Sequence, residues 1–134
     1  MTNSGENVRP PLAAYEDLAR MVDFAALAPN FSEEQVAQAC EVARNYRVGR
    51  LTVRPADLDL VAQWMKGSGI AIGTTVAFPH GAETTSAKLY AVRDVLQRGA
   101  KAVETVLNLG KVLAAGTPAE IRSHREVVNA YLGG

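Results

Sequence analysis

The chain has 134 residues, a size typical of one domain with one hydrophobic core, and its 14 basic and 14 acidic residues give a formal net charge of zero. The basic residues are scattered, with no aromatic residues between them, so the sequence carries no signature of a nucleic-acid or anionic membrane partner. No run of 18 apolar residues predicts a transmembrane helix. The single cysteine, Cys40, excludes an internal disulfide and is expected as a small core residue rather than a reactive thiol.

The N-terminal segment is polar and lacks the apolar stretch of a signal peptide. We therefore expect residues 1–9 to form a flexible tail, residues 10–134 to form a single domain, and the protein to be cytoplasmic.

Along the rest of the chain, helical and strand patterns alternate. Ser32 with Gln35, and Thr117 with Glu120, have the spacing of N-terminal capping boxes. Gly67 and Gly99 stand where helix-ending glycines are expected. The expected order is helix 10–20, strand 21–27, helix 32–46, strand 50–53, helix 55–66, strand 70–78, helix 83–98, strand 101–109 and helix 117–134.

A helix followed by four strand–helix units predicts an α/β domain with a parallel sheet and right-handed crossovers. The segment "IAIGTTVAF" is almost continuously apolar, as is typical of a parallel strand that is covered on both faces.

Two acidic residues, Asp23 and Glu104, interrupt apolar strands. A carboxylate in such a place is costly unless it is paired or hydrogen-bonded. Acids that face the inside of an α/β barrel often act as general acids or bases. They can equally be structural partners of a buried lysine or of backbone amides, and the pattern alone leaves both interpretations open.

The carboxyl ends of the predicted strands hold further polar residues, at positions 52–54, 74–80 and 104–108. Ligands of parallel α/β proteins bind at this edge of the sheet. His80 follows the third strand and is either a site residue or an ordinary loop histidine. No lysine lies inside an apolar strand, where burial would lower its pKa for Schiff-base chemistry. Lys88 and Lys111 lie near the edge. No motif indicates a metal or a cofactor.

Three stretches, "LARMVDFAALAPNFSEEQV", "GTTVAFPHGAETTSAK" and "GAKAVETVLNLG", resemble the deoxyribose-phosphate aldolase family. The resemblance extends over residues 18–131. It implies a TIM-barrel-like (βα)4 half-barrel with parallel strands and an N-terminal helix, corresponding to the N-terminal half of the family's eight-stranded barrel. It also implies a Schiff-base aldolase that reversibly cleaves 2-deoxyribose 5-phosphate into glyceraldehyde 3-phosphate and acetaldehyde without a metal.

The same resemblance assigns roles to residues. The family's proton-relay aspartate on strand four corresponds to Glu104, and Asp23 is retained as a residue that orients its neighbours. The residues implied to line the substrate pocket are Thr52, which replaces a common cysteine, Thr74, His80 and Asn108.

Several departures from the family accompany these matches. Phe24 and Ala25 replace a polar pair, Ala28 stands where a lysine is usual, and Lys101 and Ala102 replace two acidic residues. The family's Schiff-base lysine on strand six, its second lysine on strand seven and its phosphate-binding loops have no counterpart in this sequence.

Three interpretations follow. The chain could be part of an aldolase whose lysine comes from another polypeptide, with a sugar phosphate or an aldehyde as ligand. It could be a non-catalytic half-barrel that associates with itself or with a partner. Lys88 or Lys111 could also form the imine in a homodimeric barrel. In each case unpaired edge strands predict a homo-oligomer or a second half-barrel chain.

Overall fold

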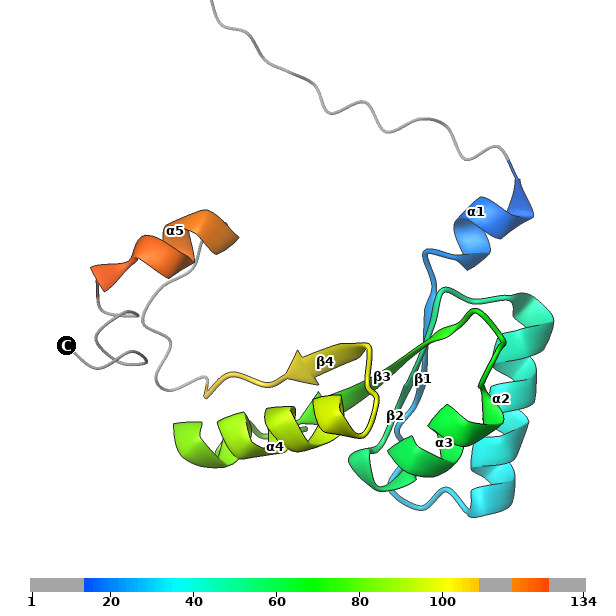
Figure 1. Cartoon of the computed structure of the whole chain (residues 1–134), viewed down its shortest axis with the longest axis horizontal. Helices are drawn as coiled ribbons and strands as arrows, with labels where there is room; N and C mark the ends of the chain where they lie inside the picture. Colours follow the sequence, from blue (N-terminus) through cyan, green and yellow to red (C-terminus); the bar gives the residue numbers. More distant parts are fainter. Residues whose placement is uncertain (1–13, 109–116, 126–134) are drawn as a thin grey trace, which may run out of the picture.

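The computed structural model describes residues 14–108 and 117–125. Its centre is a four-stranded parallel sheet with the strand order β1-β2-β3-β4 (Figure 1). The predicted α/β unit with parallel strands is confirmed, whereas the expected tail at residues 1–9 lies outside the described residues. The strands are β1 (Asp23–Ala26), β2 (Arg50–Val53), β3 (Ala71–Val76) and β4 (Ala102–Thr105).

The helices follow the predicted order. Ser32 begins the second helix as expected, because its side chain accepts a hydrogen bond from the Gln35 amide and the Gln35 side chain accepts one from the Ser32 amide. Pro55 opens a short 3-10 turn before the third helix, which ends ahead of Gly67. The elements are α1 (Tyr15–Ala19), α2 (Glu33–Tyr46), η1 (Pro55–Asp57), α3 (Leu58–Trp64), α4 (Thr85–Gln97) and α5 (Pro118–Ser123).

The strand predicted over residues 101–109 is shorter in the structure and ends at Thr105. Its neighbour β3 explains the difference. The Val106 amide still donates to the Val76 carbonyl at 3.2 Å, but Ala77, the first residue after β3, has a φ of 61°. The chain after β3 therefore turns away from the sheet at Ala77, and Leu107 has no strand to pair with among the described residues.

One face of the sheet holds the hydrophobic core. Leu51 and Val53 point to this face and are fully buried, and Leu58 and Val61 of α3 are buried with them. Helices α2, α3 and α4 cover this side (Figure 1). Burial of each such Leu or Val side chain is worth about 1.5–3 kcal/mol, so this layer holds the strands in place.

The opposite face, which we call the inner face, carries the alternate residues of each strand. Asp23 lies beside Arg50, Thr52 lies beside Gly73, and Thr75 lies beside Glu104. The polar residues of the strands are thus concentrated on the side away from the helical layer.

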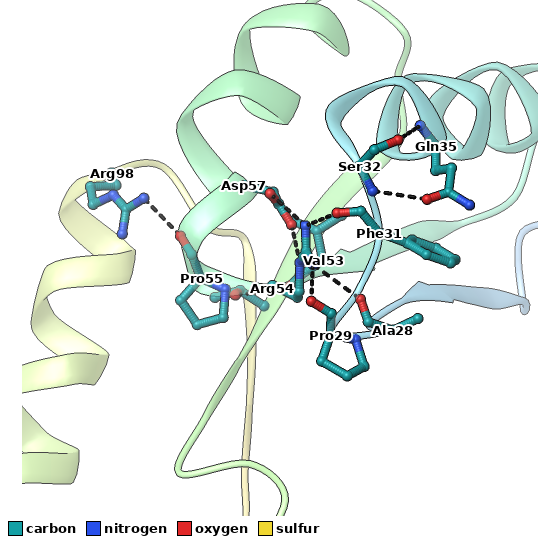
Figure 2. Close-up of polar contacts among 11 residues, drawn as sticks. Ala28, Pro29, Phe31, Ser32, Gln35, Val53, Arg54, Pro55, Asp57 and Arg98 are labelled. Carbon is teal, nitrogen blue, oxygen red and sulfur yellow. Dashed lines mark hydrogen bonds and ion pairs between the residues drawn. The ribbon is translucent and has the colours of Figure 1, made fainter.

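The loops at the carboxyl edge are joined by Arg54, the first residue after β2 (Figure 2). Its guanidinium donates to the carbonyls of Ala28, Pro29 and Phe31 and forms a two-point ion pair with Asp57. Arg54 therefore fixes the loop between β1 and α2 against the end of η1.

We expect Arg54→Lys to lower the thermal unfolding midpoint, because one ammonium group cannot reproduce a planar fork with this many acceptors. Calorimetry of the variant checks this. Arg93→Lys, at an exposed position on α4, is the matched control and should leave the midpoint unchanged. Equal midpoints for the two variants would show that Arg54 does not hold the loops.

Candidate functional site

Four side chains of the inner face form one hydrogen-bonded group, the inner-face cluster: Asp23, Arg50, Thr52 and Glu104. The Arg50 Nε donates to Asp23 Oδ2 at 2.7 Å, and Arg50 Nη2 donates to Glu104 Oε1 at 3.0 Å. The Thr52 hydroxyl donates to the Asp23 carboxylate, at 2.8 Å from Oδ1. The cluster therefore joins β1, β2 and β4 through one guanidinium.

The two carboxylates come from β1 and β4, the first and last strands of the sheet. In a flat sheet, strands three spacings apart lie about 14 Å from each other. Arg50 starts from β2, between these two strands, and the long side chains of Arg50 and Glu104 together span the distance to β4. The cluster thus links the first strand of the sheet to the last.

Burial and charge separate the two acids. Burial raises the pKa of Asp23, but hydrogen bonds from Arg50 and Thr52 lower it more, so the pKa of Asp23 lies below its ordinary value. Hydrogen bonding to Asp23, followed by burial, raises the pKa of Glu104 above its ordinary value despite the charge of Arg50. Of the two acids, Glu104 is the one that takes up a proton first.

The arrangement suits proton transfer at Glu104. A pair of titratable groups whose pKa values are pushed apart has the character of an acid–base site. The Glu104 side chain is 50% exposed, whereas that of Asp23 is 28% exposed, so Glu104 is also the acid that a ligand can reach. Asp23 is held ionised and fixed in place.

The other predicted site residues lie in different places. Thr52 belongs to the cluster. Thr74 is fully buried on the helix-covered face, next to Val53, and its hydroxyl donates to the Val53 carbonyl at 2.8 Å. His80 is exposed in the loop after β3, and Asn108 is half-buried after β4. The structure therefore brings Thr52, but not Thr74, to the face that carries the two acids.

Lys88 has a definite structural position. Its ammonium donates to the carbonyls of Gly81 and Val106, both at 2.8 Å, and so ties the loop after β3 to the segment after β4. Gly81 makes this contact possible, because its φ is 64° and an added Cβ would lie 2.2 Å from the Leu107 carbonyl oxygen. Lys111 lies outside the described residues.

Replacing Lys88 by methionine, which keeps most of the length of the side chain but removes the donor, is expected to lower the free energy of unfolding by about 1–2 kcal/mol. Both carbonyls lose a partner, and the two loops lose their link. Denaturant unfolding measures the change. Lys101→Met, at an exposed site, is the control, and an equal loss in both variants would contradict the role assigned to Lys88.

A cavity of about 500 Å³ lies at the other edge of the sheet, where the strands begin. It is rich in basic residues, but Arg44 donates to the Trp64 carbonyl and Arg47 pairs with Glu16. No Asp or Glu among the described residues lines this cavity, so it has no general acid or base, and we do not assign it as the catalytic site despite its size. Its lining is Arg20, Arg44, Arg47, Val48 and residues 66–70.

The sequence pattern does not single out Arg50. The signal was present, since Arg50 begins its strand as Asp23 begins the preceding one, and neighbouring parallel strands place such residues side by side. The sequence left open which group pairs with the carboxylates in the apolar strands, a buried lysine or backbone amides. In the structure the partner is an arginine, Arg50 on β2.

Two further observations concern the parts of the chain that the structure describes. No helix there is long and apolar enough to cross a bilayer. Within residues 14–108 and 117–125, no group of three His, Cys, Asp or Glu side chains is placed to hold a metal ion.

One family model matches a short C-terminal stretch. The model is described as a branched-chain amino acid ATP-binding cassette transporter, and the match covers residues 111–134. Because this is a small fraction of the chain, it assigns no family to the domain.

Curated relatives match most of the chain. A deoxyribose-phosphate aldolase of Listeria welshimeri is 34% identical over 116 residues, which are 87% of this chain and 52% of the relative. A deoxyribose-phosphate aldolase of Bacillus cytotoxicus is 31% identical over 117 residues, with the same shares of the two chains. The chain thus spans about half the length of the curated relatives it matches.

A solved structure agrees with them. The deoxyribose phosphate aldolase of Aeropyrum pernix, described as having a unique tetrameric structure, matches with a TM-score of 0.68 and 26% identity. The match covers 74% of this chain and 42% of that one. Sequence and fold together therefore make this chain a member of the deoxyribose-phosphate aldolase family that matches about half the length of its relatives, with four parallel strands alternating with helices as in part of their barrel.

Proposed function

We propose that the chain supplies one half of a Schiff-base aldolase site, in which Glu104 transfers protons and the remainder of the barrel supplies the imine-forming lysine. The observation that carries this proposal is the meeting of the Asp23 and Glu104 carboxylates on the inner face, where Glu104 is both the more exposed and the more readily protonated. The substrate class follows from the relatives, which are aldolases of deoxyribose phosphate.

The chemistry requires one group that can both accept and return a proton. Once a lysine has formed an imine with C1 of 2-deoxyribose 5-phosphate, a base takes the proton of the 3-hydroxyl, and the C2–C3 bond breaks. Glyceraldehyde 3-phosphate leaves, and an acid then protonates C2 of the enamine. Hydrolysis of the resulting imine releases acetaldehyde and the lysine. Glu104 fits both proton steps.

The other residues of the site have supporting roles. Asp23 remains ionised and orients Glu104 through the shared Arg50, and Thr52 fixes Asp23. His80 and Asn108 contribute to substrate binding from the loops after β3 and β4. Thr74 is left out of the pocket, because its hydroxyl is buried on the helix-covered face.

The proposal places the imine-forming lysine outside the described half-barrel. Within the described residues, no lysine is hydrogen-bonded or ion-paired to Asp23 or Glu104, and Lys88 is engaged by two carbonyls. The outer edges of β1 and β4 pair with no strand among the described residues, and a second half-barrel would cover both. That half could be a further part of a longer polypeptide or a separate chain.

A second candidate function is a non-catalytic half-barrel that associates with itself or with a partner. The observation that favours it is Arg50, which already pairs with both acids without any second half. On this alternative the cluster is a structural device, and the inner face is covered by another protein without chemistry.

A chimera tests the two candidates. The chain is fused to the half of the Listeria welshimeri relative that the match leaves out, and cleavage of 2-deoxyribose 5-phosphate is measured. The aldolase proposal expects cleavage by the chimera and none by the chain alone. A chimera that folds, as judged by circular dichroism and a cooperative thermal transition, yet does not cleave the substrate would overturn the proposal in favour of the non-catalytic half-barrel.

A further inference from the structure

We infer that Arg50 is a positioning residue of this site, whose guanidinium holds the carboxylates of Asp23 and Glu104 together so that they act as one proton-sharing pair. The inference rests on the proposed function for its consequence in catalysis. Its test, however, observes the two carboxylates directly and requires no activity.

The contacts of Arg50 are those of a bridge and not of a simple ion pair. Nε and Nη2 approach Asp23, and Nη2 also reaches Glu104 at 3.0 Å. The planar guanidinium presents its donors at fixed angles, which a lysine ammonium cannot reproduce. Removing the fork would separate the acids even if a positive charge remained.

The sheet leaves space for the Arg50 side chain above Gly73. Arg50 lies on β2 and must pass over β3 to meet Glu104 on β4, and the β3 residues on the inner face at this level are Ala71 and Gly73. A Cβ added at Gly73 would lie 3.1 Å from Arg50 Cδ and 2.8 Å from Thr52 Oγ1. The absence of a side chain at Gly73 is therefore what allows Arg50 to cross the strand.

The charges that face the pair can be enumerated for the described strands. On the inner face, β1 contributes Asp23, β2 contributes Arg50, β3 contributes no ionisable group, and β4 contributes Glu104. With both acids ionised this group carries one net negative charge. Without Arg50 it would carry two, and the repulsion between like charges would favour protonation of the pair.

This arrangement also keeps the site assembled through a proton-transfer cycle. When Glu104 takes up a proton, its attraction to the guanidinium weakens, but Arg50 stays attached to Asp23 through Nε. The guanidinium therefore remains in place for Glu104 to rebind when the proton leaves. Asp23 acts as the anchor of Arg50 and Glu104 as its exchangeable partner.

The experiment is a carbon-13 NMR titration of the Asp and Glu side-chain carboxyls in the full chain. In the unmodified chain, Asp23 should titrate below its ordinary range, Glu104 above its own, and each signal should respond to the titration of the other. In Arg50→Met both midpoints should shift upward. In Arg50→Lys the titration midpoint of Asp23 should shift upward by less than in Arg50→Met. The response of the Asp23 signal to the titration of Glu104 should also weaken.

Two further variants sharpen the test. Gly73→Val retains Arg50 but fills the space above residue 73 that its side chain occupies. This variant should shift the titration midpoint of Asp23 in the same direction as Arg50→Met and weaken the response of the Asp23 signal to the titration of Glu104. Arg93→Met removes an exposed arginine on α4 and should leave both titrations unchanged. Circular dichroism shows that each variant is folded. The inference is overturned if folded Arg50→Met and Gly73→Val titrate like Arg93→Met.

The result can be separated from the fate of the proposed function. In the chimera, Arg50→Lys should displace the pH profile of kcat/KM and not merely reduce its height, whereas Arg93→Met should leave the profile unchanged. An inactive chimera with Arg50-dependent titrations would support the bridge and reject the aldolase proposal. An active chimera with titrations that do not depend on Arg50 would reject the bridge alone.

Discussion

In the completed barrel, Glu104→Gln is expected to lower kcat for cleavage of 2-deoxyribose 5-phosphate by about 10²–10⁴-fold, the usual contribution of a general acid–base group. Glutamine keeps the size and can still accept a hydrogen bond from Arg50, but it cannot carry a proton. KM should change little, because the substitution removes an interaction that matters during proton transfer. Steady-state kinetics of the two chimeras measure the difference.

Two controls accompany this prediction. Glu83→Gln, at an exposed loop position, should leave kcat unchanged. Glu104→Asp restores the residue that the family resemblance implies at this position and should retain much of the activity, although the carboxylate is withdrawn by one methylene. A Glu104→Gln chimera with undiminished kcat would show that Glu104 moves no proton in the reaction.

Asp23→Ala is expected to lower the free energy of unfolding by about 2 kcal/mol. Thr52 is 1% exposed, so its hydroxyl would be left buried without its acceptor, and Arg50 would retain only Glu104. Urea unfolding at neutral pH measures the loss. Asp59→Ala breaks an exposed ion pair with Arg98 and should cost less than about 1 kcal/mol.

The same substitution should show a definite pH dependence. The pKa of Asp23 in the folded chain lies below its ordinary value of 3.8, so folding favours the ionised form, which is held by Arg50 and Thr52. Its stabilisation is therefore complete well above 3.8 and is lost as the pH falls through the lower folded value. The difference in the free energy of unfolding between the unmodified chain and Asp23→Ala should narrow below about pH 4. A gap that widened toward acid pH would contradict this sign.

The elements of the fold were predictable because local signals and tertiary packing agree. Residues 50–53, which include the β-branched Thr52 and Val53, form a strand over the predicted range, and Ser32 with Gln35 begins a helix as a capping box. The end of β4 was not predictable from its own residues, since the strand ends where β3 turns away at Ala77. Strand length is decided by the partner.

The site was predictable in part. Asp23 and Glu104 stood out because a carboxylate in an apolar strand needs a partner. The role of Arg50 depends on the register of two strands and on Gly73, a residue with no chemistry of its own. Thr74 lies toward the carboxyl end of its strand, as a site residue would, but strand alternation directs it to the helix-covered face. A pattern of residue types does not by itself show which face of the sheet a residue points to.

The measurement that most directly tests the central claim, that this chain carries half of a Schiff-base site, is borohydride trapping on the chimera with 2-deoxyribose 5-phosphate, followed by peptide mapping by mass spectrometry. We expect one covalent adduct, on a lysine of the added half, and no adduct on Lys88 or on any other lysine of this chain. An adduct on Lys88, or a folded chimera that forms none, would contradict the account.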